Sequence, residues 1–170
     1  MRIGALDLAT ASGWAVDAEG GGHPRLGTFR LPDVARGHAF LAFEKFLYEF
    51  LHDNHVERVA VEKPMFVPAP GRFVYEETSL KLIGLVALTE SVTAALGLPP
   101  VELVGVTTIR KYFCGHGRAK KPDVMARCRQ LGWAFANDNE SDAAALWSYA
   151  KATRDRTFRI DTGPRLAQTA

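Results

Sequence analysis

One acidic residue inside an apolar opening segment constrains this chain more than any other feature. The segment Arg2–Leu8 alternates and then turns apolar, which predicts a strand, and Asp7 lies at its end. A carboxylate among apolar neighbours is costly to bury unless a cation or hydrogen-bond donors accompany it. Asp7 therefore indicates a cation site or, in the simpler alternative, a strand-end turn capped through Thr10 or Ser12.

The rest of the pattern predicts an α/β fold with one mixed, five-stranded sheet. Strands expected at Gly13–Asp17 and Leu26–Leu31 would form an antiparallel meander with the first strand, since turn residues separate them. The strands Arg58–Glu62 and Val101–Val104 would return in parallel through crossover helices, which places helices on both faces. The helices are expected at Asp33–Asn54, Tyr75–Leu96, Thr107–Phe113, Pro122–Leu131 and Asn139–Lys151.

Size and composition favour a soluble chain with one domain. The chain has 170 residues, 47% hydrophobic and 24% charged, and no uninterrupted apolar run long enough to predict a membrane span. We expect one domain over residues 1–154 and a flexible tail over 155–170. Cys114 and Cys128 lie outside any CxxC pair, so neither a disulfide framework nor a cysteine zinc site is expected. Together with the acid at Asp7, which argues against a signal peptide, this predicts a cytoplasmic location.

Two more carboxylates are predicted to reach the same end of the sheet as Asp7. Glu62 ends a strand in VAVEKP, and Asp142 lies in the first turn of the last helix, in DNESDAAAL. Ligands gather at the carboxyl ends of adjacent parallel strands, and a site made only of oxygen atoms suits Mg²⁺ or Mn²⁺. The simpler alternatives are a salt bridge from Glu62 to Lys63 or Arg58, and a favourable helix dipole at Asp142.

Two polar residues just before Asp142 leave the composition of this site open. Asp138 precedes Asp142 by four residues, so the two carboxylates would share a helix face and repel unless a cation lies between them. Asn139 precedes Asp142 by three residues and could ligate through its carbonyl oxygen or serve as an N-cap.

Residues 108–129 carry seven cations against one acid, which predicts a basic surface. A phosphate backbone would bind such a surface, although a merely solvated charged face is the alternative. The predicted phosphate contacts are Arg110, Lys111, Arg118, Lys120, Lys121, Arg127 and Arg129.

Five segments in order resemble the motifs of RuvC-type Holliday-junction resolvases, which belong to the RNase H-like nuclease superfamily. DLATASGWAV and VAVEKPMF resemble the first two motifs, and LKLIGLVALTESV resembles the long helix that follows them. GHGRAKKPDVMARC is similar to the glycine loop and basic helix, and ESDAAALWSYA to the last motif. The resemblance covers residues 1–152, and the short chain is more similar to phage-type members.

This resemblance implies an RNase H-like fold and an active site with two Mg²⁺ or Mn²⁺ ions. Asp7, Glu62 and Asp142 match three metal ligands of the family. The fourth ligand, an aspartate or histidine in the family, falls at Asn139, so the neutral amide serves there or Asp138 substitutes for it.

The resemblance also implies a homodimer that cuts branched DNA, without a nucleotide cofactor or a membrane partner. Lys121 matches a basic residue near the scissile phosphate, with Lys120 beside it. Phe66, with Phe73 as a second candidate, matches an aromatic residue that can wedge into a junction. The apolar segment Tyr75–Leu96 is the candidate dimer interface, and burial within one chain is the alternative.

The function expected from these residues is metal-dependent, paired cleavage of four-way DNA junctions in recombination or repair, leaving 5′-phosphate and 3′-hydroxyl ends. Asp7 would bridge two ions, and Lys121 would neutralise charge on the phosphate. The alternatives are another RNase H-like nuclease, acting on RNA–DNA hybrids or as an exonuclease, and a catalytically weak junction-binding protein, which Asn139 motivates. A sugar-kinase or actin-like ATPase would need a second domain, for which the chain is too short.

Overall fold

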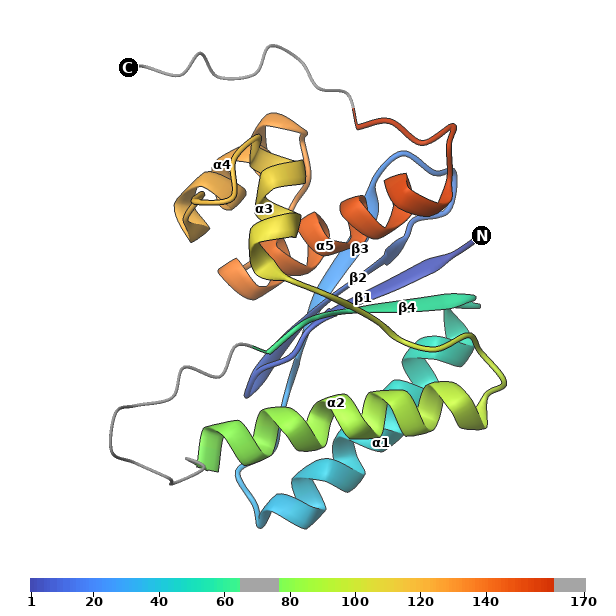
Figure 1. The fold of residues 1–170 in the computed structure, drawn as a ribbon. Coiled ribbons are helices and arrows are strands. Elements are labelled where there is room, and N and C mark those ends of the chain that lie inside the picture. The colour runs from blue at the N-terminus through green and yellow to red at the C-terminus, as the bar shows by residue number, and fades with distance from the viewer. Residues whose placement is uncertain (65–76, 161–170) are drawn as a thin grey trace.

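A five-stranded mixed sheet organises the computed structural model, which describes residues 1–64 and 77–160 (Figure 1). The order of its strands is β3-β2-β1-β4-β5. The strands are β1 (Ile3–Asp7), β2 (Ala11–Asp17), β3 (Pro24–Arg30), β4 (Arg58–Glu62) and β5 (Glu102–Val104). The helices are α1 (Arg36–Asp53), α2 (Glu77–Ala95), α3 (Val106–Cys114), α4 (Lys121–Gln130) and α5 (Asp138–Arg154).

The sheet combines the predicted antiparallel meander with parallel strands. β2 pairs antiparallel with both β1 and β3, whereas β4 pairs parallel with β1 and with β5. The register of β1 and β4 sets Leu6 opposite Val61. The next residue along each strand is an acid, so Asp7 and Glu62 leave the sheet side by side at the same end.

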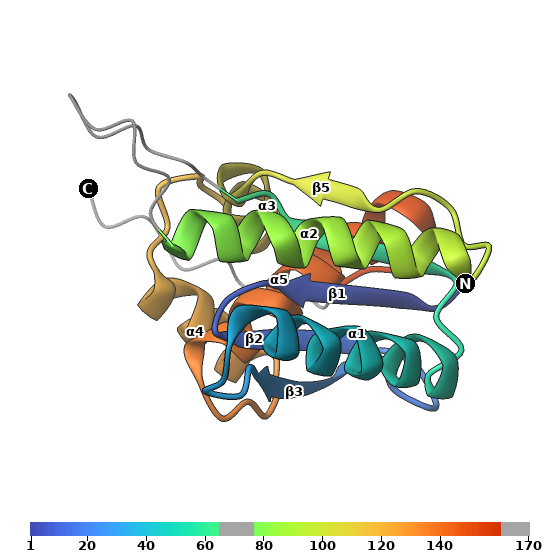
Figure 2. The same cartoon turned by 90° about the horizontal axis from the view of Figure 1, so that it is seen from below.

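Helices cover both faces of the sheet, as the element order predicted. α1 and α2 lie on one face, and α3, α4 and α5 lie on the other (Figures 1 and 2). Two hydrophobic cores fill the layers, one around Trp147 beneath α5 and one around Phe43 beneath α1. On its own face α5 packs directly on β1 and β2, and this contact brings the start of α5 to the acidic end of β1.

A glycine in β2 permits this close contact. A Cβ atom on Gly13 would lie 2.0 Å from the backbone oxygen of Asn139, so any larger residue would push α5 away from the sheet. Beside it, Asn139 Nδ2 donates to the carbonyl oxygen of Ala11 over 2.8 Å. The start of α5 is therefore fixed to β2 by both shape and a hydrogen bond.

The predicted starts of α1 and α5 were wrong, and α3 and α4 each begin one residue before their expected starts. α1 begins at Arg36 with Ala35 as its N-cap, not at Asp33, because the first helical hydrogen bond runs from Ala39 to Ala35. α5 begins at Asp138, and its N-cap is Asn137, whose side chain accepts from the backbone nitrogen of Glu140. Asn139 is thus not the N-cap, and Asp142 belongs to the second turn of the helix rather than the first.

Helix α2 combines a buried face with an exposed apolar one. Leu85 and Val92 enter the core next to α1, and Gly84 allows Phe40 to approach α2 closely. Within the described residues, α2 alone is long and apolar enough to cross a membrane, and 22% of that stretch is buried. Core helices of soluble proteins meet the same criterion, so this property is weak support for a membrane span.

The chain continues along the α5 layer after the last helix ends. Phe158 packs edge-on against Trp147, with ring centroids 5.3 Å apart, so the first part of the predicted tail is attached to the core. Residues 161–170 lie outside the described residues, and the domain division at residue 154 stays a prediction.

Candidate active site

Three carboxylates that are far apart in sequence meet at one end of the sheet. Asp7 and Glu62 end the parallel neighbours β1 and β4, and Asp142 reaches them from the second turn of α5. Asp142 is only 8% exposed, and the other two side chains are partly buried. The structure therefore brings together the three residues that the sequence predicted to converge.

These carboxylates repel one another in a poorly hydrated environment. Burial, followed by the charges of Glu62 and Asp142, raises the pKa of Asp7 to about 7. Burial, followed by the charge of Asp142, likewise raises the pKa of Glu62 to about 7. Neither Asp7 nor Glu62 accepts a hydrogen bond within residues 1–64 and 77–160. The cluster thus lacks the donors that stabilise buried carboxylates and favours a positive ligand.

The simpler explanations for Asp7 and Glu62 do not hold in the structure. Ser12 hydrogen-bonds to the backbone nitrogen and oxygen of Ala9, at 3.1 and 2.9 Å, rather than to Asp7. Thr10 accepts from Lys81 at 3.5 Å. In the part of the chain that the structure describes, Glu62 forms no salt bridge.

Lys121 is a cation at the edge of the cluster. It is the first residue of α4, and its Nζ lies 2.6 Å from Asp138 Oδ2 and 3.9 Å from Asp142 Oδ2. The hydrogen bond from Lys121 lowers the pKa of Asp138 and raises that of Lys121. Lys121 therefore compensates the predicted repulsion between Asp138 and Asp142, and Asp138 is engaged by this ammonium group.

Asn139 has a structural role that explains why an amide stands there. Its Nδ2 group donates to the Ala11 carbonyl, and an aspartate at this position would instead place two acceptors against that oxygen. The hydrogen bond fixes the amide plane and leaves Oδ1 without a donor among the described residues. Among the described residues, this oxygen therefore keeps its capacity to accept or to ligate.

The chemistry of this donor set fits a hard divalent cation. Carboxylate oxygens from Asp7, Glu62 and Asp142 are the ligands that Mg²⁺ and Mn²⁺ prefer. Within residues 1–64 and 77–160, however, no three acidic, histidine or cysteine side chains stand in a ready-made metal-binding arrangement.

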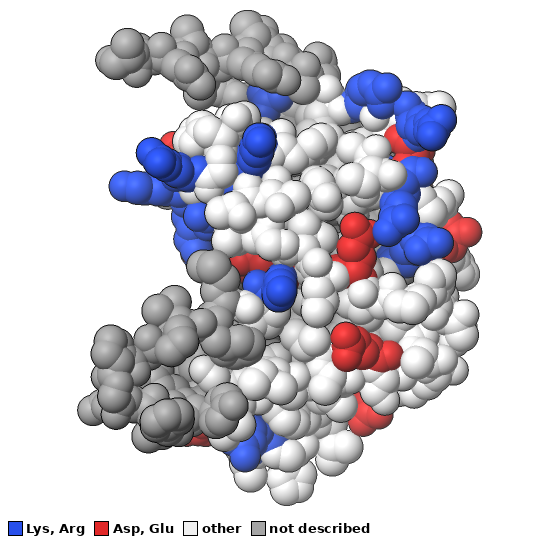
Figure 3. Space-filling model, viewed as in Figure 1, with Lys and Arg blue, Asp and Glu red and all other residues white. Residues whose placement is uncertain are grey.

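Most of the predicted phosphate contacts lie on the surface of α3, α4 and the loop between them. Basic side chains project from this part of the molecule in Figure 3. Those that are exposed are Lys111, Arg118, Lys120, Lys121 and Arg129, and Arg127 is half-buried.

Arg110 differs from the other basic residues because it turns inward. Its NH1 group donates to the backbone oxygen of Ala119 over 2.9 Å, and its Nε atom is buried without a partner. Burial raises the pKa of Glu62 and of Asp142, and the positive charge of Arg110 opposes this rise. Arg110 thus faces the acidic cluster and holds the loop that precedes Lys121.

Sequence reasoning missed contacts that hold α5 in place. Glu140 is buried and accepts from the Thr28 hydroxyl at 2.8 Å, which no local pattern signals. At the other end of the helix, Lys151 lies 2.8 Å from Asp17, which also accepts from the Ile3 backbone nitrogen at 2.7 Å. A glycine inside a strand was the available signal for the close approach at β2.

The predicted aromatic wedge residues, Phe66 and Phe73, lie outside the described residues, so their position is untested.

Comparison with known proteins identifies the fold. No protein-family model and no curated protein matches this sequence. Among solved structures, Thermus thermophilus RuvC is 24% identical, with a TM-score of 0.68 over 91% of this chain and 96% of that one. T. thermophilus RuvC in complex with Holliday junction substrate is 23% identical, with a TM-score of 0.71 over 91% and 95% of the two chains.

A more distant structure has the same architecture. The yeast mitochondrial Holliday junction resolvase Ydc2 is 13% identical, with a TM-score of 0.61 over 91% of this chain and 81% of that one. These similarities show that the chain shares the RuvC fold, which confirms the predicted mixed sheet with helices on both faces.

Proposed function

We propose that this RuvC-fold chain is a metal-dependent DNA endonuclease, a crossover junction endodeoxyribonuclease that resolves four-way junctions by paired cleavage. The observation that carries the proposal is the meeting of Asp7, Glu62 and Asp142 at one end of the sheet, with Lys121 beside them. Buried carboxylates that lack hydrogen-bond donors suit the binding of cations, and phosphodiester hydrolysis uses such cations. In a protein of the same fold, T. thermophilus RuvC, a solved complex contains Holliday junction substrate.

The side chains of the cluster would bind the metal ions that the reaction needs. Asp7, Glu62 and Asp142 would hold Mg²⁺ or Mn²⁺, two ions per site in our proposal, which supply Lewis acidity and an activated water. In this proposal the Oδ1 atom of Asn139 would add a neutral oxygen ligand, while its amide nitrogen anchors α5 to β2. Because the fourth ligand would be the neutral amide oxygen of Asn139, the protein is expected to bind metal ions more weakly than a site with four carboxylates.

Lys121 and Arg110 are the cationic side chains that we assign to the active site. Without substrate, the ammonium group of Lys121 donates a hydrogen bond to Asp138. When DNA is bound, it would donate instead to a non-bridging phosphate oxygen. Arg110 favours the ionised form of Glu62 and Asp142. It also fixes Ala119, two residues before Lys121, and so orients the start of α4.

The basic surface of α3 and α4 would hold the arms of the DNA. Its cations bind phosphates, which positions a duplex without reading its sequence. Selection of branched DNA must then come from the relative placement of two such surfaces, which a homodimer would provide.

Helix α2 is the surface that we propose for this homodimer. Leu80 and Ile83 are each 42% exposed on a helix whose opposite side is packed against the core. An apolar face of this kind favours association with a second copy. Ile83→Glu should shift the protein from dimer to monomer in sedimentation equilibrium, while Leu103→Glu, which changes an equally exposed residue on β5, should not.

The reaction itself is tested with three labelled substrates: a four-way junction, a linear duplex and an RNA–DNA hybrid. Each is incubated with Mg²⁺, Mn²⁺ or EDTA and with wild-type protein, Asp7→Asn or Asp53→Asn. Asp53 is an exposed acid remote from the cluster and serves as the matched control. We expect paired nicks in the junction that require the metal, disappear with Asp7→Asn and persist with Asp53→Asn.

Other outcomes would redirect the proposal. Cleavage of the hybrid in preference to the junction would indicate an RNase H-type enzyme. Junction binding without any cleavage would favour a protein that only binds branched DNA, which the neutral residue Asn139 makes a specific second candidate. We further propose a cytoplasmic location, supported by the free thiols Cys114 and Cys128.

A further inference from the structure

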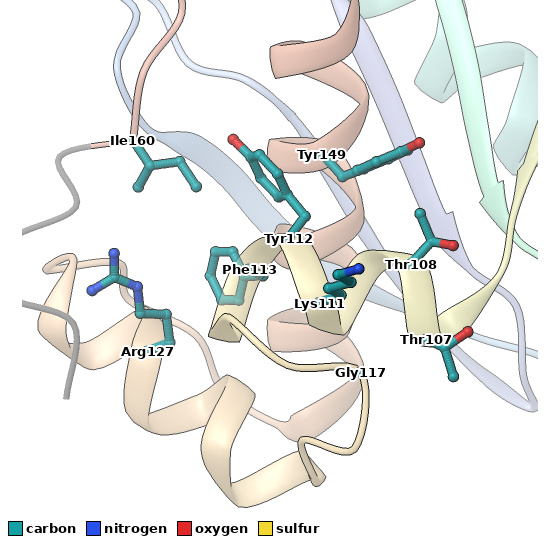
Figure 4. A pocket seen from close by; sticks show the side chains of 9 residues that line it. All are labelled: Thr107, Thr108, Lys111, Tyr112, Phe113, Gly117, Arg127, Tyr149 and Ile160. Carbon is teal, nitrogen blue, oxygen red and sulfur yellow. The ribbon is translucent and has the colours of Figure 1, made fainter. Parts of the chain in front are cut away.

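A hollow outside the acidic cluster has no role in the chemistry proposed above. It encloses about 700 Å³ and opens between α3, α4, α5 and the segment that follows α5 (Figure 4). The side chains that matter for its chemistry are those of Thr108, Lys111, Tyr112, Arg127 and Tyr149. Its volume lies within the roughly 300–1,000 Å³ of pockets that accommodate small ligands or single building blocks of a polymer.

The charges at this hollow favour an anion. Both charged residues that line it are cations, Lys111 from α3 and Arg127 from α4, and none of its lining residues is acidic. The hydroxyl-bearing side chains of Thr107 and Thr108 line the same hollow and add hydrogen-bond donors. Such a set of cations and hydroxyl groups suits a phosphate group rather than an apolar peptide.

The aromatic residues add a second kind of surface. Tyr112 and Tyr149 form an edge-to-face pair with ring centroids 5.7 Å apart, and Tyr112 remains 38% exposed. The neighbouring Phe113 is buried and stacks on Trp133 at 5.8 Å, which fixes α3 to the core. The tyrosine pair is therefore held on a rigid base, and rigid exposed rings are the surfaces on which unpaired nucleobases stack.

We propose that this hollow binds one unpaired nucleotide of the DNA substrate, with its phosphate at Lys111 and its base against Tyr112, while Arg127, on the other side of Phe113 (Figure 4), would meet a neighbouring phosphate of the same DNA strand. A phosphate of intact duplex would use the cations but not the tyrosines, since paired bases keep their faces inside the stack. The inference rests on the proposed function, because DNA is the substrate in both.

The hollow lies close enough to the acidic cluster for one DNA strand to contact both. Gly117 lines the hollow, and Lys121 at the cluster follows four residues later. Four residues span at most about 14 Å of extended chain, which a few nucleotides also cover. The hollow would thus select branched DNA that carries unpaired nucleotides near the cleavage point.

The test compares two junctions, one fully paired and one with a short unpaired thymidine segment at its branch, by fluorescence anisotropy. Tyr112→Ala should weaken binding of the second junction by roughly 5- to 150-fold, the range for the loss of one base–aromatic stack, and binding of the paired junction by less than about twofold. Tyr112→Phe should retain binding because it keeps the ring. Tyr48→Ala on α1 removes an equally exposed tyrosine and should change neither affinity.

A second measurement does not depend on how well the alanine variant folds. Wild-type protein is irradiated with a junction that carries 5-iododeoxyuridine in the unpaired segment, and the cross-linked peptide is sequenced. Attachment at Tyr112 or Tyr149 supports the proposal. Equal loss of affinity for both junctions, or attachment elsewhere, overturns it while leaving the endonuclease proposal intact. Failure of the wild-type protein to bind either junction would instead refute the proposed function, and this inference with it.

Discussion

Replacing Asp7 with asparagine should stabilise the metal-free protein, and the gain should grow as pH rises. In the folded chain, burial and the neighbouring acids raise the pKa of Asp7 from 3.8 to about 7. In the unfolded chain the same carboxyl loses its proton near its ordinary value. Between these two pKa values the folded state binds more protons than the unfolded state, so the free energy of unfolding falls as pH rises. The loss that Asp7 causes is complete above its folded pKa.

The size of the effect follows from the difference between the two pKa values. A shift from 3.8 to about 7 corresponds to at most about 4 kcal/mol of unfolding free energy at pH values well above 7. At pH 5 the folded carboxyl is still protonated, and the same relation leaves a penalty of about 2 kcal/mol. The neutral amide of Asp7→Asn removes both penalties, so its advantage over wild type should be about 2–3 kcal/mol larger at pH 8 than at pH 5.

Urea denaturation in EDTA, followed by tryptophan fluorescence at both pH values, measures this difference. Asp53→Asn is the matched control, because its carboxyl is exposed and remote from the cluster. An advantage of Asp7→Asn that is the same at pH 5 and pH 8, or a variant less stable than wild type at pH 8, would refute a buried, mutually repelling acidic cluster.

Three further measurements test the metal site and the placement of α5. Millimolar Mn²⁺ should raise the melting temperature of wild type and EDTA should reverse it, whereas Asp7→Asn should show no shift in the same thermal scans, since ligands stabilise only a state that binds them. Gly13→Ala should cost about 3 kcal/mol and abolish nicking, because its new methyl group would overlap a backbone oxygen of α5, while Gly37→Ala has open space and should be neutral or slightly stabilising in urea titrations. Lys151→Met should cost about 3 kcal/mol in the same titrations because it leaves buried Asp17 without its ion pair, and retention of full stability would contradict that assignment.

Local sequence patterns were sufficient to predict the strands of this protein and two residues of its candidate site. Apolar alternation with intervening turn residues was sufficient to predict all five strands, because strands at a buried sheet need apolar side chains wherever they occur. The convergence of Asp7 and Glu62 was also predictable, since parallel neighbouring strands end at the same edge of a sheet. Helix ends were less predictable: α5 begins one residue before its expected start, and the true cap at Asn137 competes with similar polar neighbours.

Only the tertiary structure decided which partner each polar side chain takes. Asn139 and Ala11 are 128 positions apart, so no local pattern shows that the amide belongs to a backbone carbonyl on β2. The ammonium of Lys121 meets Asp138, and Arg110 turns inward from a segment that otherwise looks uniformly basic. These contacts depend on how closely α5 and α4 pack against their neighbours. Hydrophobic periodicity does not encode such distances, because it reports which face of an element is buried and not which residues lie against that face.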